Sequence, residues 1–161
     1  MREIPLTQGY IALVDDDDYA DLIRFKWFSC TRHRVVYPAT HISGGGELLM
    51  PQHIMGKPAR GFLIDHIDHN GLNNQRQNLR FVTKAENAMN SRKQTIHLGQ
   101  IPSSIYKGVC WDKARGKWTV YIKIGGVRKF LGRFDDEKEA ALAYNVAAKK
   151  LFGAYAYPNE V

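Results

Sequence analysis

Two apolar runs near the middle of the chain predict a β-hairpin. Residues 63–67 and 79–82 each have the length and composition of a β-strand. Between the two runs, the dipeptide Asn70-Gly71 is typical of a tight turn with positive φ. The pattern therefore predicts two strands that return on each other across this turn.

A helix is predicted directly after the second strand. Thr83 through Glu86 has the S/T-x-x-E form of a capping box, in which a hydroxyl and a carboxylate satisfy free N–H groups at a helix start. Asn87 would then lie in the first turn of that helix. A helix laid across the hairpin could bring Asn87 back beside Asp65.

The part of the chain before the hairpin is predicted to be rich in short strands. Its composition favours strands at 10–14, 26–30, 35–40 and 47–50, a glycine loop at 44–46, and short helices at 19–25 and 52–55. An acidic run, residues 15–18, precedes the first helix. Acidic side chains are favoured at a helix N-terminus, so we interpret the run as structural, with a metal site as the alternative.

The last third of the chain predicts a three-stranded antiparallel sheet packed on one C-terminal helix. We expect strands at 105–111, 117–124 and 127–134, the last two joined across Gly125-Gly126. The middle strand alternates Thr119, Tyr121 and Lys123 with the apolar residues Trp118, Val120, Ile122 and Ile124. Since alternate side chains point to opposite faces, one face is apolar and the other is available to a ligand.

A helix over residues 135–152 is expected to cover the apolar face of this sheet. Asp135 or Asp136 can cap its start, and Gly153 marks its end. The apolar residues at helical spacing are Ala140, Ala143, Tyr144, Ala147 and Leu151.

Composition and charge narrow the function classes. With 161 residues and 44% apolar residues, the chain is long enough for one domain or two small ones and is not expected to be disordered. The net charge of +7 favours a polyanionic partner, although a membrane surface or a ribosomal role would fit equally well. Residues 104–134 carry eight Lys/Arg against one acidic residue, so the basic charge is concentrated there.

Targeting signals and cysteine pairs are missing from the sequence pattern. Cys30 and Cys110 form no C-x-x-C pair, which gives little support to a zinc site or a disulfide framework. No apolar run could span a bilayer, and the first residues lack the apolar core of a signal peptide. We therefore expect a cytoplasmic protein, in a bacterial or phage-infected cell, that is not secreted and has no membrane partner.

Asp65 and His66 at the end of the first hairpin strand are the main candidates for chemistry. Neighbouring strand residues point to opposite faces, so the two can share a task only where the strand ends or bends. Asp65 and Asn87 would give two oxygen ligands suited to Mg²⁺ or Mn²⁺, and His66 would be a general base for a water nucleophile. A surface turn with asparagine loop and cap chemistry is the alternative.

Three further residues are weaker candidates. His53 and Asn90 are possible phosphate contacts, and the alternative for His53 is a histidine packed at a domain edge. His69 forms an H-x-x-H spacing with His66 that would suit zinc, but no third nitrogen or sulfur ligand accompanies it.

The stretch from Leu63 to Arg92 closely resembles the HNH nuclease family, which has the ββα-metal fold. By this resemblance His66 is the family's first histidine, Asn78 the central asparagine, and Asn87 the last position, where this subclass carries Asn instead of His. The resemblance implies one-metal phosphodiester hydrolysis in which His66 activates water and Asp65 and Asn87 hold the cation. Asn78 would orient His66 or brace the loop. The motif ALVDDDDY and the following K-W resemble the N-terminal extension of small phage-type HNH proteins.

The motifs YKGV, GKW, FLGRF and EKEAALAYNVAAKKLFG resemble the plant ethylene-response-factor DNA-binding domain of Apetala-two type. In that family the sheet enters the major groove, which agrees with the concentrated basic charge. The sequence departs from the family at Cys110, where the family has Arg, at Asp112, which falls near another basic position, and in a loop before GKW that is one residue longer. The resemblance predicts DNA contacts, to phosphate or base, by Lys107, Trp111, Arg115, Lys117, Tyr121, Lys123, Arg128, Phe130 and Arg133.

Together these features predict an α+β protein of two domains. An HNH nuclease domain with a β-rich N-terminal extension would occupy 1–92, a linker 93–104, and an ethylene-response-factor-like DNA-binding domain 105–161. The expected function is a metal-dependent, homing-type endonuclease of phage or other mobile origin that acts on double-stranded DNA without a small-molecule cofactor. The alternatives are a sequence-specific DNA-binding regulator and a non-specific or structure-specific nuclease. The sequence leaves the target, the physiological metal and nick versus double-strand break open, and for the oligomeric state it slightly favours a monomer.

Overall fold

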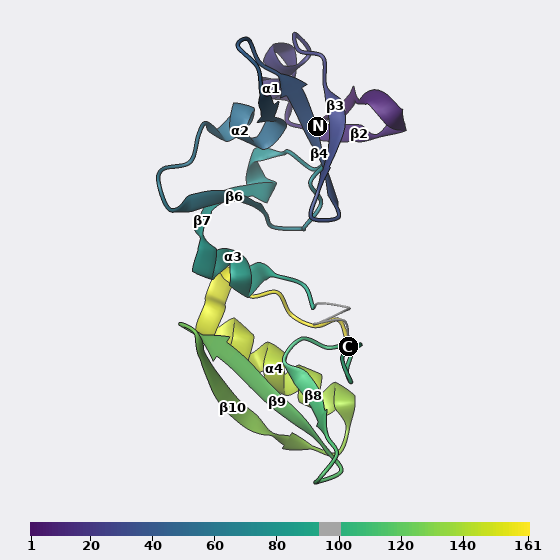
Figure 1. The fold of residues 1–161 in the computed structure, drawn as a ribbon, viewed down its shortest axis with the longest axis vertical. Helices are drawn as coiled ribbons and strands as arrows, with labels where there is room; N and C mark the ends of the chain where they lie inside the picture. The colour runs from purple at the N-terminus through teal and green to yellow at the C-terminus, as the bar shows by residue number, and fades with distance from the viewer. Residues whose placement is uncertain (94–100) are drawn as a thin grey trace. The chain divides into compact units, whose positions relative to one another are not determined.

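The chain forms two compact units, Met1–Lys84 and Ala85–Val161 (Figure 1). The computed structural model describes residues 1–93 and 101–161, so most of the linker predicted at 93–104 lies outside the described residues. The division between the units falls at the start of the helix that follows the hairpin, and that helix groups with the second unit. The domain limits 1–92 and 105–161 stay a prediction.

The first unit begins with two small sheets and two short helices. Their bounds are β1 Arg2–Pro5, η1 Thr7–Gly9, β2 Ile11–Val14, α1 Asp16–Leu22, β3 Phe28–Arg32, β4 Val35–His41, β5 Glu47–Leu49 and α2 Met50–Met55. β1 pairs antiparallel with β2, and β3, β4 and β5 form an antiparallel sheet in that order. Most of the strands predicted here are confirmed to within two residues, but β1 was not predicted.

The first helix starts earlier than predicted. The sequence suggested a helix at 19–25, whereas α1 begins at Asp16 and ends at Leu22. Asp16, Asp17 and Asp18 therefore form its first turn, where the positive end of the helix dipole favours carboxylates. This position agrees with the interpretation that the acidic run stabilises a helix N-terminus.

The predicted hairpin is present, but its connection is not a tight turn. β6, Phe62–His66, pairs antiparallel with β7, Leu79–Thr83. The connecting residues make a long loop that includes η2, Arg76–Asn78. Within this loop the residue with positive φ is His69, at 61°. The prediction of a positive φ at Asn70-Gly71 is therefore wrong. Gly71 is required for space instead, because a Cβ there would lie 2.5 Å from the carbonyl oxygen of Val36.

One hydrophobic core joins the N-terminal elements to the hairpin. Its buried residues are Ile4, Leu6, Ala12, Val14, Leu22, Trp27, Met50, Ile54 and Leu79. Leu79 is the first residue of β7, and the others come from β1, β2, α1, α2 and their connections. The N-terminal extension is therefore part of the body that supports the hairpin.

The second unit has the predicted sheet and helix. After α3, Lys84–Asn90, come β8 Val109–Asp112, β9 Lys117–Ile124, β10 Val127–Phe134, α4 Glu137–Phe152 and η3 Gly153–Tyr155. The sheet is antiparallel in the order β10-β9-β8, and α4 lies along one face of it (Figure 1). β9 and β10 have the predicted bounds, while the strand predicted at 105–111 is shorter and shifted towards the C-terminus.

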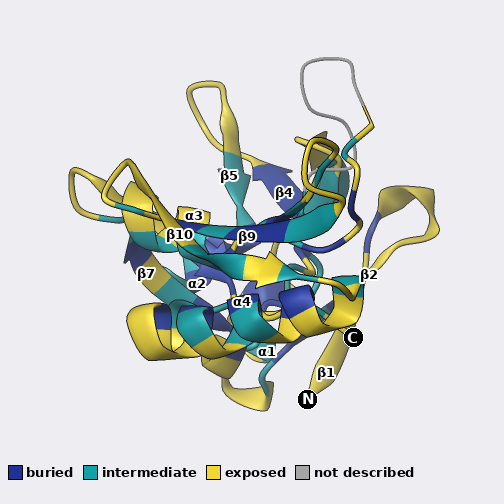
Figure 2. Cartoon of the chain, turned by 90° about the horizontal axis from the view of Figure 1, so that it is seen from below, coloured by how far each residue is buried: buried dark blue, intermediate teal, exposed yellow. Residues whose placement is uncertain are grey.

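The core of the second unit lies between the sheet and α4. Val120 and Ile122 of β9 are buried against Ala140, Ala141, Tyr144, Ala148 and Phe152 of α4. Around α4, buried and exposed positions alternate (Figure 2). Leu151, predicted to face the core, is 42% exposed, because Phe152 takes the buried position at the end of the helix. Within residues 1–93 and 101–161, no helix has the length and apolar character to cross a membrane.

Candidate active site and nucleic-acid surface

Asp65 and His66 lie at the end of β6, and both are buried. Asp65 is 8% exposed and His66 is 6% exposed. Arg80, the cross-strand partner of Asp65, donates from Nε and Nη2 to Asp65 Oδ2 over 3.0 and 2.9 Å. This charge-assisted pair fixes the position of the carboxylate inside the hairpin.

His66 is oriented by Asn74, which the sequence analysis did not single out. Nε2 of His66 lies 3.3 Å from Oδ1 of Asn74, and Nδ2 of Asn74 donates to the carbonyl oxygen of Gly71 over 3.2 Å. Since a carbonyl only accepts, it fixes the orientation of the amide and turns Oδ1 towards the ring. Nε2 of His66 therefore carries the proton, and Nδ1 is the basic nitrogen of the neutral ring.

Burial also sets the protonation state of His66. Removal from solvent lowers the pKa of His66 below its ordinary value of 6.5, against a weaker opposing effect of the hydrogen bond to Asn74. The ring of Tyr37 lies 5.7 Å from the imidazole, measured between ring centres. At neutral pH His66 is thus an uncharged imidazole, the form that a general base needs.

Asn78 has the contacts of a loop brace. Its Nδ2 donates to Oδ1 of Asp68 over 2.9 Å and to the carbonyl of Asn73 over 2.8 Å, and its Oδ1 accepts from the Asp68 N–H over 3.1 Å. Of the two roles expected for Asn78, these contacts favour bracing the loop. In the sequence, the only sign of an orienting role for Asn74 was that asparagines recur between residues 70 and 78.

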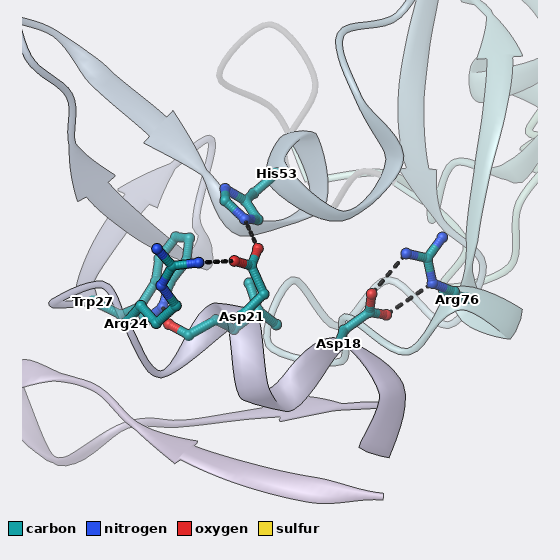
Figure 3. A network of polar contacts seen from close by, with 7 residues as sticks. Asp18, Asp21, Arg24, Trp27, His53 and Arg76 are labelled. Carbon is teal, nitrogen blue, oxygen red and sulfur yellow. Dashed lines mark hydrogen bonds and ion pairs between the residues drawn. The ribbon is translucent and has the colours of Figure 1, made fainter.

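The loop that carries Asn74 is held by the N-terminal extension. Leu13 of β2 donates to the carbonyl of Leu72 over 2.8 Å and accepts from the Asn74 N–H over 2.7 Å. Asp15 accepts from the Arg76 N–H over 2.8 Å. The guanidinium of Arg76 also pairs with Asp18, at 2.8 and 2.6 Å (Figure 3). The acidic run therefore has partners on the loop next to the candidate base.

His53 lies on α2 in a separate polar network. Its Nε2 is 2.6 Å from Oδ2 of Asp21, whose other oxygen accepts from Arg24 over 3.3 Å (Figure 3). The rings of Phe25 and Trp27 lie 4.7 and 6.1 Å away. This geometry supports a packed residue that ties α1 to α2, and a phosphate contact by His53 stays a prediction.

Asn87 and Asn90 lie on α3, three residues apart and hence at neighbouring positions of the helix. Asn90 is buried, with 3% of its surface exposed, and a phosphate contact by Asn90 stays a prediction. α3 begins directly after Thr83, as the capping box predicts, with Glu86 in its first turn. The approach of Asn87 to Asp65 stays a prediction, because the two residues belong to different compact units.

The candidate ligands Asp65 and Asn87 offer oxygen atoms, which suit a hard cation. Among the described residues no three His, Cys, Asp or Glu side chains gather into a metal-binding group. A site built on Asp65 would therefore need amide oxygen, water and phosphate oxygen to complete it. Mg²⁺ is bound in this way, through one or two carboxylates together with waters and substrate phosphates.

Five of the predicted DNA contacts share one face of the sheet in the second unit. β9 and β10 place Lys123 opposite Arg128, Tyr121 opposite Phe130 and Thr119 opposite Arg133. These β9 residues alternate with buried Val120 and Ile122, so the face points away from α4. The basic-aromatic face consists of Tyr121, Lys123, Arg128, Phe130 and Arg133.

Cation–π contacts organise this basic-aromatic face. The guanidinium carbon of Arg128 lies 3.7 Å from the centre of the Tyr121 ring, and that of Arg133 lies 5.0 Å from the centre of the Phe130 ring. Phe130 is 46% exposed. A pocket of about 240 Å³ beside Arg128 is lined by, among others, Lys93, Cys110 and Lys123. The arrangement offers planar cations and aromatic rings to an anionic ligand.

The other four predicted DNA contacts have different surroundings. Trp111 pairs with Trp118, at 4.9 Å between ring centres, on the side of the sheet that packs against α4. Arg115 pairs with Asp112 over 3.2 Å, and Lys117 pairs with Asp135. Lys107 donates to two backbone carbonyls near the end of α3.

Comparisons with known proteins point to two families. Residues 54–89 match the family model of HNH endonucleases. An uncharacterized HNH endonuclease of Acanthamoeba polyphaga mimivirus is 31% identical over 157 residues, which cover 96% of this chain and 77% of that protein. Protein 3.8 of Escherichia phage T7 is 36% identical over 71 residues, 44% of this chain and 54% of its own length.

A plant protein matches the C-terminal part. Dehydration-responsive element-binding protein 2D of Arabidopsis thaliana is 48% identical over 59 residues, which cover 35% of this chain and 28% of that protein. The match thus covers about a third of this chain, in the C-terminal part where the motifs predicted it.

Proposed function

Because the chain belongs to the HNH endonuclease family, and is therefore a nuclease, we propose that it hydrolyses phosphodiester bonds of double-stranded DNA with His66 as the general base. The observation that carries this proposal is the buried His66, which Asn74 orients so that Nδ1 is its basic nitrogen. Asp65, held by Arg80, lies next to it in the chain at the end of β6.

His66 acts on the attacking water. Nδ1 takes a proton from a water molecule while the water oxygen attacks phosphorus, and the bond from phosphorus to the 3′ oxygen breaks. The hydrogen bond to Asn74 Oδ1 favours the protonated ring that results. Positioned general bases contribute on the order of 10²- to 10⁴-fold in rate.

Asp65 and Asn87 hold a divalent cation, Mg²⁺ or Mn²⁺, in this proposal. When bound, the cation supplies charge stabilisation for the phosphate and the leaving 3′ oxygen. Arg80 keeps the Asp65 carboxylate in place, and Asn78 keeps the loop closed around Asp68. Asn90, three residues after Asn87, is proposed as a contact to a neighbouring phosphate.

The basic-aromatic face of the sheet binds the DNA target. Arg128 and Arg133 suit phosphate or guanine edges, because a guanidinium donates in a planar fork. The similarity to a plant protein named as a response-element-binding protein supports a groove-reading role. A nuclease that carries its own domain for binding the DNA target fits a homing-type endonuclease of phage or other mobile origin.

A non-specific nuclease is the main alternative. Asp112, which falls near a position where the plant domain carries a basic residue, lies 3.2 Å from Arg115 and 3.8 Å from Arg133. This acidic residue competes with DNA for two of the predicted contacts and favours weaker sequence reading.

Mapping of cleavage ends on random-sequence duplexes tests the proposal. The purified protein is incubated with Mg²⁺ or Mn²⁺, and the 5′ and 3′ ends are sequenced. We expect cuts that depend on the cation and cluster at a preferred sequence. Cation-dependent cuts spread over all sequences would establish the non-specific nuclease, and the absence of cation-dependent cuts would contradict the proposal.

A further inference from the structure

The helix that carries Asn87 is built into the C-terminal unit. α3 follows the nuclease hairpin in sequence, yet from Ala85 onward it groups with the residues up to Val161. Met89 of α3 packs against the core that lies between the sheet and α4. The C-terminal unit therefore supports a helix whose residues belong to the HNH motif in sequence.

Lys107 fastens the end of this helix. Its ammonium Nζ donates to the carbonyl of Met89 over 2.8 Å and to the carbonyl of Ser91 over 2.7 Å. The last carbonyls of a helix lack partners within the helix, and they lie at its negative end, where a cation is favoured. Burial lowers the pKa of Lys107 to about 8, as expected for an ammonium enclosed by protein.

Lys107 is itself tied to α4 through Asn159. The Lys107 N–H donates to Asn159 Oδ1 over 2.6 Å, and Nδ2 of Asn159 donates back to the Lys107 carbonyl over 3.1 Å. Asn145 of α4 makes the same reciprocal pair with the backbone of Asn159, at 2.6 and 2.8 Å. A continuous set of hydrogen bonds thus runs from the end of α3 to the middle of α4.

The neighbouring residue adds a second constraint. A Cβ on Gly108 would lie 2.2 Å from the ring of Tyr144 on α4, so the chain at this point lies directly on the helix. Lys107 consequently projects from a backbone that has little room to shift.

We propose that Lys107 is a positioning residue of the nuclease, which fixes the C-terminal turn of α3 to the DNA-binding domain and thereby holds the cation ligand Asn87 in place. The inference rests on the proposed role of Asn87. It assigns the DNA-binding domain a second task, support of the cation site, and it assigns Lys107 a role other than DNA contact.

Cation titration of variants tests this assignment. Lys107→Met keeps the aliphatic stem and removes the donor. It should raise the half-activating Mg²⁺ concentration on the order of tenfold, as losses of supporting contacts around a metal typically do. DNA affinity in the presence of a chelator should stay within about twofold of the wild type, and Lys107→Arg should restore part of the cation response. Lys138→Met, at an exposed position of α4, is the matched loss of charge and should change neither quantity.

Combining Lys107→Met with Asn87→Ala distinguishes a failure of the proposed function from a failure of the role assigned to Lys107. In an Asn87→Ala background, Lys107→Met should have no further effect on cation activation, because both changes act on one ligand. A chain that does not cleave, or an Asn87→Ala variant with an unchanged cation response, refutes the proposed function itself. If Asn87→Ala shifts the cation response and Lys107→Met does not, or if Lys107→Met weakens DNA binding as much as cleavage, the role of Lys107 is overturned.

Amide hydrogen exchange gives a readout apart from activity. In Lys107→Met, amides at 86–90 should exchange on the order of tenfold faster, while those of β9 keep their wild-type rates. Asn159→Ala, which releases the backbone of Lys107, should produce the same local change. Unchanged exchange of α3 in either folded variant contradicts the proposal, and so does exchange that increases equally in α3 and β9.

Discussion

At the scale of single residues, the proposed chemistry depends on a buried amide. Asn74 is 0% exposed, and both ends of its side chain have hydrogen-bond partners, one on His66 and one on the Gly71 carbonyl. Such a residue fixes the tautomer and direction of the imidazole without meeting the substrate. Its loss should therefore change the rate of the chemical step and leave DNA binding alone.

Substitution of Asn74 should give a rate defect smaller than that of His66. We expect Asn74→Ala to reduce single-turnover cleavage by about 10- to 100-fold, against about 10²- to 10⁴-fold for His66→Ala, because the misoriented ring retains some basicity. Gln77→Ala, an exposed amide on the same loop, is the control and should cleave normally. An Asn74→Ala protein that cleaves at the wild-type rate would remove the orienting role.

The acid limb of the pH profile should report His66. Burial lowers the pKa of His66, and a cation bound nearby would lower it further, so the neutral base persists below pH 6.5. The cleavage rate at saturating cation should rise with pH through that lowered pKa and level off above it. Asn74→Ala removes the hydrogen bond that favours the protonated ring and should move the limb to lower pH. A wild-type rate that still rises tenfold per pH unit between 7 and 8 contradicts this assignment.

At the scale of elements, the N-terminal extension supports the loop beside the candidate base. β2 contacts the loop through Leu13, and the start of α1 contacts it through Asp15 and Asp18. Because Leu79 of β7 shares a core with β1, β2 and α2, the hairpin and its loop are fixed to the same body. The extension therefore fixes the position of the loop beside the candidate base.

Asp15 should contribute more to stability than the exposed Asp17 of the acidic run. Asp15→Ala leaves the Arg76 N–H and the Gln75 amide without their acceptor, and should lower the free energy of unfolding by about 1–2 kcal/mol. Asp17→Ala is the matched control at an exposed position of the run, and should cost about 0.3–1 kcal/mol through the helix dipole alone. Urea denaturation of both variants measures the difference, and equal losses would show that Asp15 acts only through the helix.

Elements with a complete local signal were the ones predicted well. β9, β10 and their turn were predicted with the observed bounds, since strict alternation meets two glycines with φ of 55° and 86°. The same local reasoning failed at Asn70-Gly71, where contacts with Leu13 and Val36 determine the loop instead. For the same reason the sequence identified His66 but not its partner Asn74, which only the folded loop brings to it.

At the scale of the whole molecule, the candidate catalytic residue and the basic DNA-binding candidates lie in different parts of the chain. The candidate base lies in Met1–Lys84, and the basic-aromatic face lies in Ala85–Val161. The sequence predicted this separation from motif and charge alone. It could not predict that α3 groups with the second unit, because the packing of Met89 and the contacts of Lys107 involve residues distant in sequence.

The basic-aromatic face should account for much of the salt dependence of DNA binding. Each phosphate contact removed lowers the slope of log affinity against log salt by about 0.9, so Lys123→Ala and Arg128→Ala should each flatten it by up to that amount. Lys138→Ala, outside the face, should leave the slope unchanged. Fluorescence anisotropy over a salt series measures these slopes, and wild-type slopes in both face variants would place the DNA elsewhere.

Single-turnover cleavage of supercoiled plasmid, with wild type and His66→Ala compared at equal DNA occupancy, is the most direct test of the central claim. The account predicts that wild type converts the plasmid in Mg²⁺ or Mn²⁺ and is inactive with a chelator. It also predicts that His66→Ala binds with wild-type affinity and cleaves about 10²- to 10⁴-fold more slowly. Cleavage by His66→Ala at the wild-type rate, or wild-type cleavage that persists in the chelator, would contradict a cation-dependent nuclease with His66 as its base.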